Sequence, residues 1–106
     1  MTDRPITRIA RLEIDPAQLD DYLAYLTEEI EASIRLEPGV LMLHATARKD
    51  APHFIELLEQ YASAAAYQAH IGSPHFLKYK RGTADMVRRL ELIEVEQILL
   101  AAKPTA

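Results

Sequence analysis

Apolar residues recur along this chain with the spacings of short strands and helices. Residues 7–14 alternate as a strand, with Ile9 on one face and Ala10, Leu12 and Ile14 on the other. Residues 40–47 and 53–61 read as two more strands. Only a short polar turn separates them, so we expect an antiparallel hairpin. A last strand is expected over residues 88–100, which contain LELIEVEQILL.

A long helix is predicted between the first two strands. Asp15-Pro16 supplies an N-cap and a proline at the first helical position, and Pro38-Gly39 ends the segment. Its apolar residues form one stripe. The carboxylates of Glu28, Glu29 and Glu31 could make a paired-carboxylate site, but we expect them on a solvated helix face.

Two short helices are predicted after the third strand. Residues 63–71 are rich in alanine, and Gly72 is expected to end that helix in a left-handed conformation. Ser73-Pro74 then starts a second helix, which we expect to run to about residue 85.

The order β-α-β-β-α-β predicts an α+β, ferredoxin-like split βαβ fold, formed by a single domain over residues 1–106. Helices can cover only one face of such a sheet, yet the strands at 40–47 and 53–61 are apolar on both faces. We therefore expect a homodimer in which the two open faces pack together, with the ILLAA segment crossing to the partner. Residues 1–5 and 101–106 are expected to fray.

Composition narrows the class of protein. The net charge of −4 argues against nucleic acid and against an anionic membrane surface as partners. The absence of cysteine removes disulfides, thiolate nucleophiles and zinc-thiolate sites. No apolar run approaches about 18 residues, and the N-terminus is charged where a signal peptide is apolar. A soluble cytoplasmic protein is expected.

Titratable and aromatic side chains concentrate between Glu59 and Tyr79, a stretch with two of the four histidines and three of the five tyrosines. His70 is the strongest candidate for chemistry, because Tyr67, His70 and Ile71 share one side of their predicted helix. A neutral imidazole in a partly dry pocket can take a proton from a phenol or an activated C–H. The alternative is a structural histidine satisfied by one hydrogen bond.

Neighbouring residues could complete a pocket. His75 and Phe76 could line the same cleft, or His75 could be a partly exposed residue of the helix-starting turn. Strand alternation is expected to place His44 beside Glu59. That carboxylate could then orient either His44 or His70, or form an ordinary cross-strand pair.

Two further side chains have competing interpretations. Arg11 could bind an anionic ligand, or form an ion pair with Glu13 or Glu94. A metal site is disfavoured, because His70 and His75 are five residues apart across a break with no carboxylate between them.

Three short motifs resemble the antibiotic biosynthesis monooxygenase family. They are Glu59-Gln60-Tyr61 at a strand end, Ala66-Tyr67-Gln68-Ala69-His70 at a helix end, and Ser73-Pro74-His75-Phe76 at a helix start. Glu37-Pro38-Gly39 also resembles the family's helix-to-strand turn. The resemblance implies a dimeric α+β barrel that oxidises small electron-rich aromatics, such as quinols or anthrones, with O₂ and without metal, flavin or haem.

The resemblance also implies roles for individual residues. His70 would be the catalytic base or the phenol-orienting group, and Glu59 would support it. Further residues would bind the substrate: Tyr61, Tyr67, His75 and Phe76 by the resemblance, and His44 and Arg11 by their predicted strand positions.

Departures from the family pattern keep other functions open. The chain has no tryptophan and no asparagine, which disfavours the haem-degrading branch. An isomerase acting on a phosphorylated ketone would need a cationic anchor, which Lys78, Lys80 or Arg81 could supply. A non-enzymatic dimer that binds a small ligand, in which His70 is structural, is the third possibility.

Overall fold

The computed structural model describes residues 4–104 as one sheet with helices on one side. The expected fraying at residues 1–5 and 101–106 falls partly on residues 1–3 and 105–106, which lie outside the described part. The elements in chain order are β1 (Ile6–Ile14), a 3₁₀ turn η1 (Pro16–Gln18), α1 (Leu19–Leu36), β2 (Val40–Ala47), β3 (Phe54–Tyr61), α2 (Ala64–Ile71), α3 (Pro74–Gly82) and β4 (Val87–Val95).

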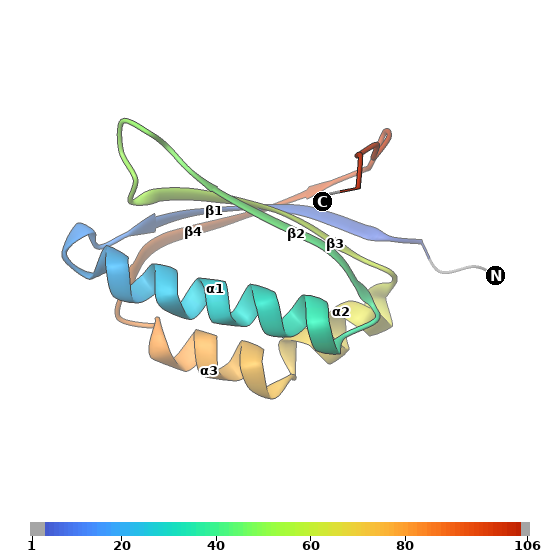
Figure 1. Ribbon diagram of the computed structural model, residues 1–106, viewed down its shortest axis with the longest axis horizontal. Coiled ribbons are helices and arrows are strands. Elements are labelled where there is room, and N and C mark those ends of the chain that lie inside the picture. The colour runs from blue at the N-terminus through green and yellow to red at the C-terminus, as the bar shows by residue number, and fades with distance from the viewer. Residues whose placement is uncertain (1–3, 105–106) are drawn as a thin grey trace.

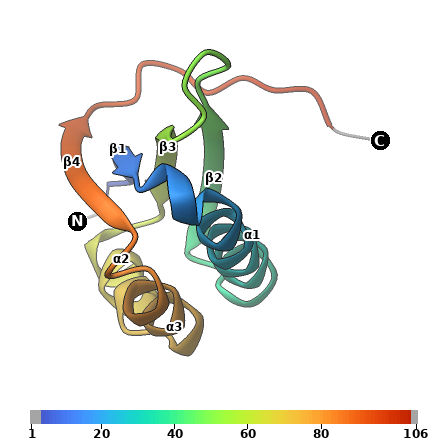
Figure 2. The same cartoon turned by 90° about the vertical axis from the view of Figure 1, so that its left-hand side faces the viewer.

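The four strands form an antiparallel sheet in the order β2-β3-β1-β4. All three helices lie on one face of this sheet, and no helix covers the other face within the described residues (Figures 1 and 2). This is the expected α+β, ferredoxin-like arrangement.

The core lies between α1 and the helix-facing side of the sheet. Along α1 the buried residues include Tyr22, Leu26, Glu29 and Ser33, which follow helical spacing and form one inward stripe. Glu29 is therefore buried, with only 5% of its surface exposed, and the prediction of a solvated position was wrong for this carboxylate.

Side-chain caps fix the short helices after β3. The Ser63 hydroxyl accepts a hydrogen bond from the Ala66 amide at the start of α2, and Ser73 does the same for Phe76 at the start of α3. Gly72, at the junction, has a φ of −96°, so the expected left-handed conformation is wrong. The α3 helix ends at Gly82, a few residues before the expected end.

The last strand is shorter than expected. The strand β4 ends at Val95, which pairs with Thr7 near the beginning of β1. Beyond this pair β1 offers little further backbone, so the apolar run up to Leu100 cannot continue the ladder. Ile98 and Leu99 are instead largely exposed.

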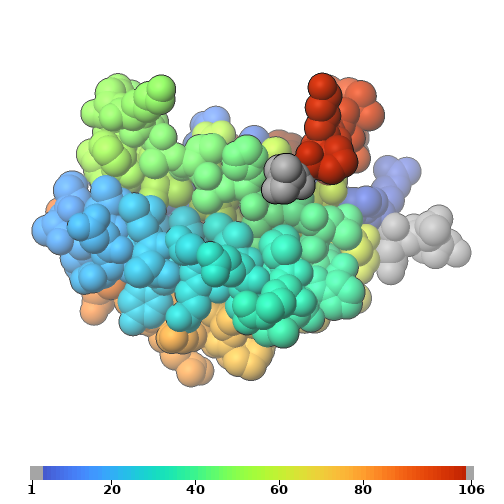
Figure 3. Space-filling model, in the orientation of Figure 1, coloured from blue at the N-terminus to red at the C-terminus, as the bar shows by residue number. Residues whose placement is uncertain are grey.

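Apolar side chains remain on the open face of the sheet. Strand pairing places Ile9, Leu58 and Ile93 side by side there. The segment after β4 passes over the same face, and Gln97 contacts the side chain of Gln60 (Figure 2). The β2–β3 turn and the C-terminal segment both project on this side and leave a hollow between them (Figure 3).

Within residues 4–104, none of the helices combines the length and the apolar character needed to cross a membrane.

Candidate functional site

A cavity of about 450 Å³ opens between the sheet and the short helices. All four strands and all three helices contribute to its wall, which is mostly apolar and aromatic. The lining residues that matter below are Arg8, Glu29, Glu59, Tyr61, Tyr67, His70, Phe76, Tyr79 and Lys80.

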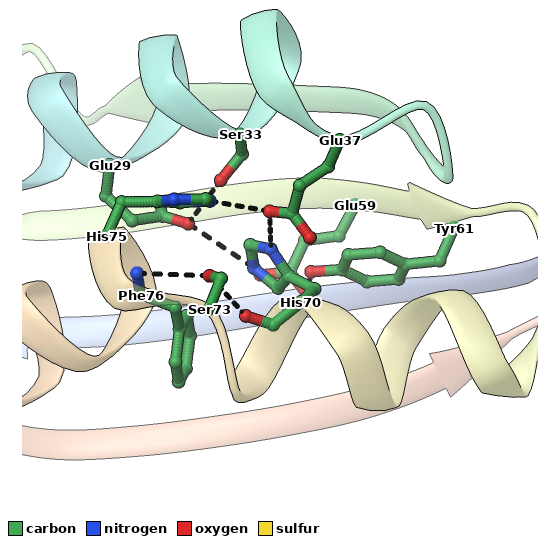
Figure 4. Close-up of polar contacts among 9 residues, drawn as sticks. All are labelled: Glu29, Ser33, Glu37, Glu59, Tyr61, His70, Ser73, His75 and Phe76. Atoms are coloured by element: carbon green, nitrogen blue, oxygen red, sulfur yellow. Dashed lines mark hydrogen bonds and ion pairs between the residues drawn. The ribbon is translucent and has the colours of Figure 1, made fainter.

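His70 lies at the inner wall, between the carboxylate of Glu29 in α1 and that of Glu37, the residue after α1. Its Nδ1 is 2.9 Å from Glu37 Oε2, and its Nε2 is 3.3 Å from Glu29 Oε1 (Figure 4). The imidazole is buried, with 3% of its side chain exposed. Both ring nitrogens are therefore engaged by protein carboxylates.

The same Glu37 oxygen also contacts His75, whose Nε2 lies 2.6 Å away. Glu29 receives a second contact, from the Ser33 hydroxyl, which donates to its Oε1 at 3.0 Å. Glu29, His70, Glu37 and His75 thus form one continuous chain of polar contacts, which we call the His70 cluster (Figure 4).

Local sequence explains how the cluster assembles. Glu29 and Ser33 are four residues apart on the inward stripe of α1, so their side chains meet. Glu37 is the residue directly after α1, and His70 is in the last turn of α2. The Ser73 cap and Pro74 start α3 immediately afterwards, which places His75 beside both.

The pKa values of the two carboxylates in the cluster are shifted in opposite directions. Burial raises the pKa of Glu29 above its usual value, because the charged form loses hydration. Partial burial also disfavours ionisation of Glu37. Hydrogen bonds from His70 and His75 outweigh that effect and hold the pKa of Glu37 below its usual value.

Glu37 Oε2 shares one proton with His70 Nδ1 and another with His75 Nε2 in its two hydrogen bonds. If neutral His70 donates from Nδ1 to Glu37, its Nε2 carries a lone pair that can accept a proton. Glu29 Oε1 lies 3.3 Å from that nitrogen.

Glu59 reaches the same cavity from β3. It accepts a hydrogen bond from the Tyr61 hydroxyl at 3.2 Å, and burial raises its pKa. The ring of Tyr61 is packed edge-on against Tyr67 and lies 5.2 Å from that of His70. No hydrogen bond joins Glu59 to His70 in the described structure, so the expected support of the imidazole comes from Glu29 and Glu37 instead.

Arg8 is a cation of the cavity wall that sequence reasoning did not single out. Its guanidinium carbon lies 4.3 Å from the centre of the Tyr67 ring, and its Nε contacts Glu94. Alternation along β1 puts Arg8 on the same face as Ala10 and Leu12, which is the only signal that could have identified it.

The structure brings most of the predicted site residues together. His70, Glu59, Tyr61, Tyr67 and Phe76 all line the cavity. His75 lies behind this wall and contributes to the His70 cluster through Glu37.

His44 and Arg11 do not line the cavity, so neither can bind a substrate there, and the predicted position of His44 beside Glu59 is wrong. A bulge at Leu41 shifts the pairing of β2, so His44 lies opposite Leu58 and Glu59 lies opposite Leu43. His44 is consequently exposed on the open face. Arg11 also lies on that face, where its Nε pairs with Glu56 at 3.1 Å rather than with Glu13 or Glu94.

Glu29 and Glu37, like Arg8, are site residues that sequence reasoning missed. Glu29 could have been found from its spacing with Leu26 and Ser33 on the buried stripe. Glu37 stands in the turn motif, but only the folded chain brings it to the two histidines.

Both the sequence and the fold of this chain are similar to those of known proteins. The family model described as antibiotic biosynthesis monooxygenase matches residues 5–82. A crystal structure from Bacteroides thetaiotaomicron, described as a "putative antibiotic biosynthesis monooxygenase", is 51% identical with a TM-score of 0.91. The match covers 96% of this chain and 97% of that one.

Two other solved structures are more distant. One, from Lactobacillus acidophilus and described as a "putative monooxygenase", is 25% identical with a TM-score of 0.83, and the match covers 86% of this chain and 43% of that one. Rv0793 from Mycobacterium tuberculosis is 26% identical with a TM-score of 0.80, and the match covers 92% and 99% of the two chains. Among curated proteins, none matches the sequence.

Proposed function

Because the chain belongs to the antibiotic biosynthesis monooxygenase family, we propose that it oxidises a small electron-rich aromatic molecule with O₂ without a cofactor. The family and its structural relatives support a monooxygenase-like function. The substrate class, a quinol or an anthrone-like phenol, is part of our proposal.

The observation that carries this proposal is the His70 cluster at the wall of an aromatic cavity. The rings of Tyr61, Tyr67 and Phe76 line a space large enough for a small polycyclic phenol. His70 and Glu29 face the same space. Substrate and base are thus held together in a mostly apolar chamber, which favours proton transfer and limits access of water to reactive intermediates.

In this mechanism His70 removes the proton from the phenol or from the activated C–H. Its Nε2 is the nitrogen that accepts it, because the 3.3 Å contact with Glu29 is the longer of the two and a substrate hydroxyl can replace it. Glu37 remains at Nδ1 and stabilises the imidazolium that forms. Glu59 and Tyr61 orient the substrate from β3.

The deprotonated aromatic then supplies the electrons. It transfers one electron to O₂, and the substrate radical and superoxide combine by forming one C–O bond. The resulting peroxide takes the proton from His70. When the O–O bond breaks, one oxygen stays as the carbonyl of a quinone and the other leaves as water with the remaining hydrogen of the same carbon.

We further propose that the protein acts as a homodimer joined through the open face of the sheet. Exposed Leu58 and the neighbouring Ile9 and Ile93 form an apolar strip there. The hollow between the β2–β3 turn and the C-terminal segment lies on the same side of the sheet (Figure 3). In a two-fold dimer the same surface of the partner would face it. A second copy is the partner expected, with no nucleic acid or membrane.

The alternative functions have less support. Of the three cations expected to anchor a phosphate, Lys80 lines the cavity, and Lys78 and Arg81 do not. Lys78 forms an ion pair with Glu28, with a nitrogen–oxygen distance of 2.7 Å. An isomerase that binds a phosphorylated ketone would therefore rely on Lys80, or on Arg8, which also lines the cavity. A dimer that only binds a ligand would leave the paired carboxylates of His70 without a chemical role.

The test is oxygen uptake by the purified protein with a panel of anthrones and hydroquinones. We expect stoichiometric conversion of one anthrone to its anthraquinone, or of one hydroquinone to the corresponding hydroxyquinone, with one oxygen atom from ¹⁸O₂ in the product. His70→Gln should lower the rate by roughly 10²–10⁴-fold, the usual contribution of a general base.

His53→Gln is the matched control, because His53 lies in the β2–β3 turn region away from the cavity and should leave the rate unchanged. Equal rates for the His70→Gln variant and the wild type would remove His70 as the base. Absence of oxygen uptake across the panel, with stabilisation by phosphorylated ketones, would favour the isomerase.

A further inference from the structure

The His70 cluster contains a second arrangement with its own chemistry. Glu37 Oε2, His70 Nδ1 and His75 Nε2 converge so that all three ligand atoms lie within 4.8 Å of one another. We propose that these residues bind a divalent transition-metal ion, with zinc as the best-suited ion, behind the wall of the aromatic cavity.

The donor set favours zinc over the alkaline-earth ions. Two imidazoles and one carboxylate suit Zn²⁺, Co²⁺ or Ni²⁺, whereas Mg²⁺ and Ca²⁺ prefer sites built from oxygen. Two histidines and a glutamate, with one position left for water or another ligand, form a known type of zinc site.

The observed distances require only a small adjustment. Ligand atoms around a tetrahedral zinc lie roughly 3.3 Å apart, given Zn–N and Zn–O bonds of about 2.1 Å. Glu37 Oε2 now lies 2.9 Å from His70 and 2.6 Å from His75, where a proton bridges each pair. Glu37 is the residue after α1. A rotation about the single bonds of its side chain would move the carboxylate by the few tenths of an ångström required.

A second observation points independently to a metal. A histidine that binds a metal usually directs its other ring nitrogen to a carboxylate, which fixes the tautomer. Here His70 Nε2 faces Glu29 Oε1 at 3.3 Å, and the Ser33 hydroxyl holds that carboxylate in place. Glu29 and Glu37 together also balance the charge of a dication in this buried position.

The sequence argued against a metal because no carboxylate lies between His70 and His75. The fold supplies that carboxylate from the end of α1, more than thirty residues earlier in the chain. Neither Glu37 nor His75 lines the aromatic cavity, so the ion would sit apart from the substrate space.

One consequence rests on the proposed function. An ion on Nδ1 fixes the N–H of His70 at Nε2, so the imidazole can no longer accept a proton from the substrate. Metal binding would then inhibit the oxidation, and a chelator would restore it.

The test measures binding directly, without reference to activity. We expect isothermal titration of the metal-free protein with Zn²⁺ to give one site per chain, Co²⁺ to develop visible d–d absorption, and Mg²⁺ to give no signal. Glu37→Gln and His75→Gln should each weaken Zn²⁺ binding by more than tenfold. Glu29→Gln, which alters only the carboxylate behind His70, should weaken it by about tenfold.

His53→Gln is the control for binding to surface histidines and should titrate as the wild type does. Thermal unfolding of each metal-free variant verifies that it is folded, and Zn²⁺ should raise the melting temperature of the wild type. The proposal is overturned if the wild type binds no Zn²⁺, or if the Glu37 and His75 variants bind it as tightly as the wild type. Neither result depends on whether the protein oxidises an aromatic substrate.

Discussion

The hydroxyl groups of Tyr22 and Tyr79 lie 2.6 Å apart and join the first turn of α1 to α3. Their rings are edge-on, with centroids 5.9 Å apart. Tyr22 is fully buried, while Tyr79 lines the aromatic cavity. This single contact therefore couples the packing of the core to the shape of the candidate site.

Tyr79→Phe should destabilise the protein by about 1–3 kcal/mol, because it leaves the buried Tyr22 hydroxyl without a partner. The double variant Tyr22→Phe/Tyr79→Phe should recover most of that loss, since neither polar group then remains. Urea unfolding of the four proteins in this cycle measures the coupling. Equal stabilities for Tyr79→Phe and the wild type would contradict the prediction.

The ionisation of Tyr79 offers a separate spectroscopic test. Burial raises the pKa of Tyr79 to about 12, although its contact with Tyr22 opposes the rise. Ultraviolet titration of a Tyr22→Phe variant should therefore show the tyrosinate of Tyr79 forming at still higher pH. A shift in the opposite direction would show that the Tyr22 hydroxyl does not stabilise the tyrosinate.

Gly39→Ala should destabilise the fold, whereas Gly72→Ala should not. A Cβ at Gly39 would lie 2.6 Å from the Cβ of Ala66 in α2, so the loop or the helix must move, at about 1–3 kcal/mol. A Cβ at Gly72 meets nothing closer than 3.7 Å. Because alanine also restricts the unfolded chain, Gly72→Ala should be neutral or stabilising by up to about 1 kcal/mol. Thermal unfolding of the Gly39→Ala and Gly72→Ala variants beside the wild type measures both changes in stability.

Glu59→Gln should stabilise the protein progressively as pH rises. Burial raises the pKa of Glu59, so the folded state binds its proton more tightly than the unfolded state does. Wild-type stability is therefore lost between the unfolded pKa of about 4.3 and the higher folded pKa, while glutamine stays neutral and can still accept from Tyr61.

Melting temperatures of the wild type and Glu59→Gln should agree near pH 4 and diverge toward pH 7. Glu31→Gln, at an exposed position of α1, provides the control and should show no such divergence. A constant difference between wild type and Glu59→Gln at all pH values would mean that the carboxylate is not disfavoured by burial.

Leu58→Glu should convert the proposed dimer into monomers. It places a charge in the middle of the open face, which the partner copy would bury without compensation. Ile34→Glu on the exposed side of α1 is the matched control, because 51% of Ile34 is exposed and it lies away from that face. Sedimentation velocity of the three proteins measures the effect, and a monomeric wild type would refute the dimer.

The periodicity of apolar residues predicted the architecture, because the arrangement of strands and helices depends on which residues become buried together. Two of the signals are local and can be recognised without knowing the fold. They are the alternation of Ala10, Leu12 and Ile14 and the proline and serine residues at the helix starts. The end of β4 was misplaced for the converse reason: the apolar run toward Leu100 has no strand beside it, and partner strands are not visible in a local pattern.

The site was only partly predictable. His70, Tyr67 and Phe76 follow from spacing near one helix break, and they do share a cavity. The predicted position of His44 was wrong because a bulge at Leu41 turns the side chains of the following strand residues to the opposite face of the sheet.

By itself, the sequence determined the order of the elements, the stripe of α1 and the gathering of histidine and tyrosine around the α2–α3 break. Only the tertiary structure decided that Glu29 and Glu37 hold His70. Those carboxylates lie more than thirty residues from it along the chain, and packing α1 against the short helices removes that separation. The same packing withdraws Glu29 from water, so it sets the electrostatics of the site as well as its geometry.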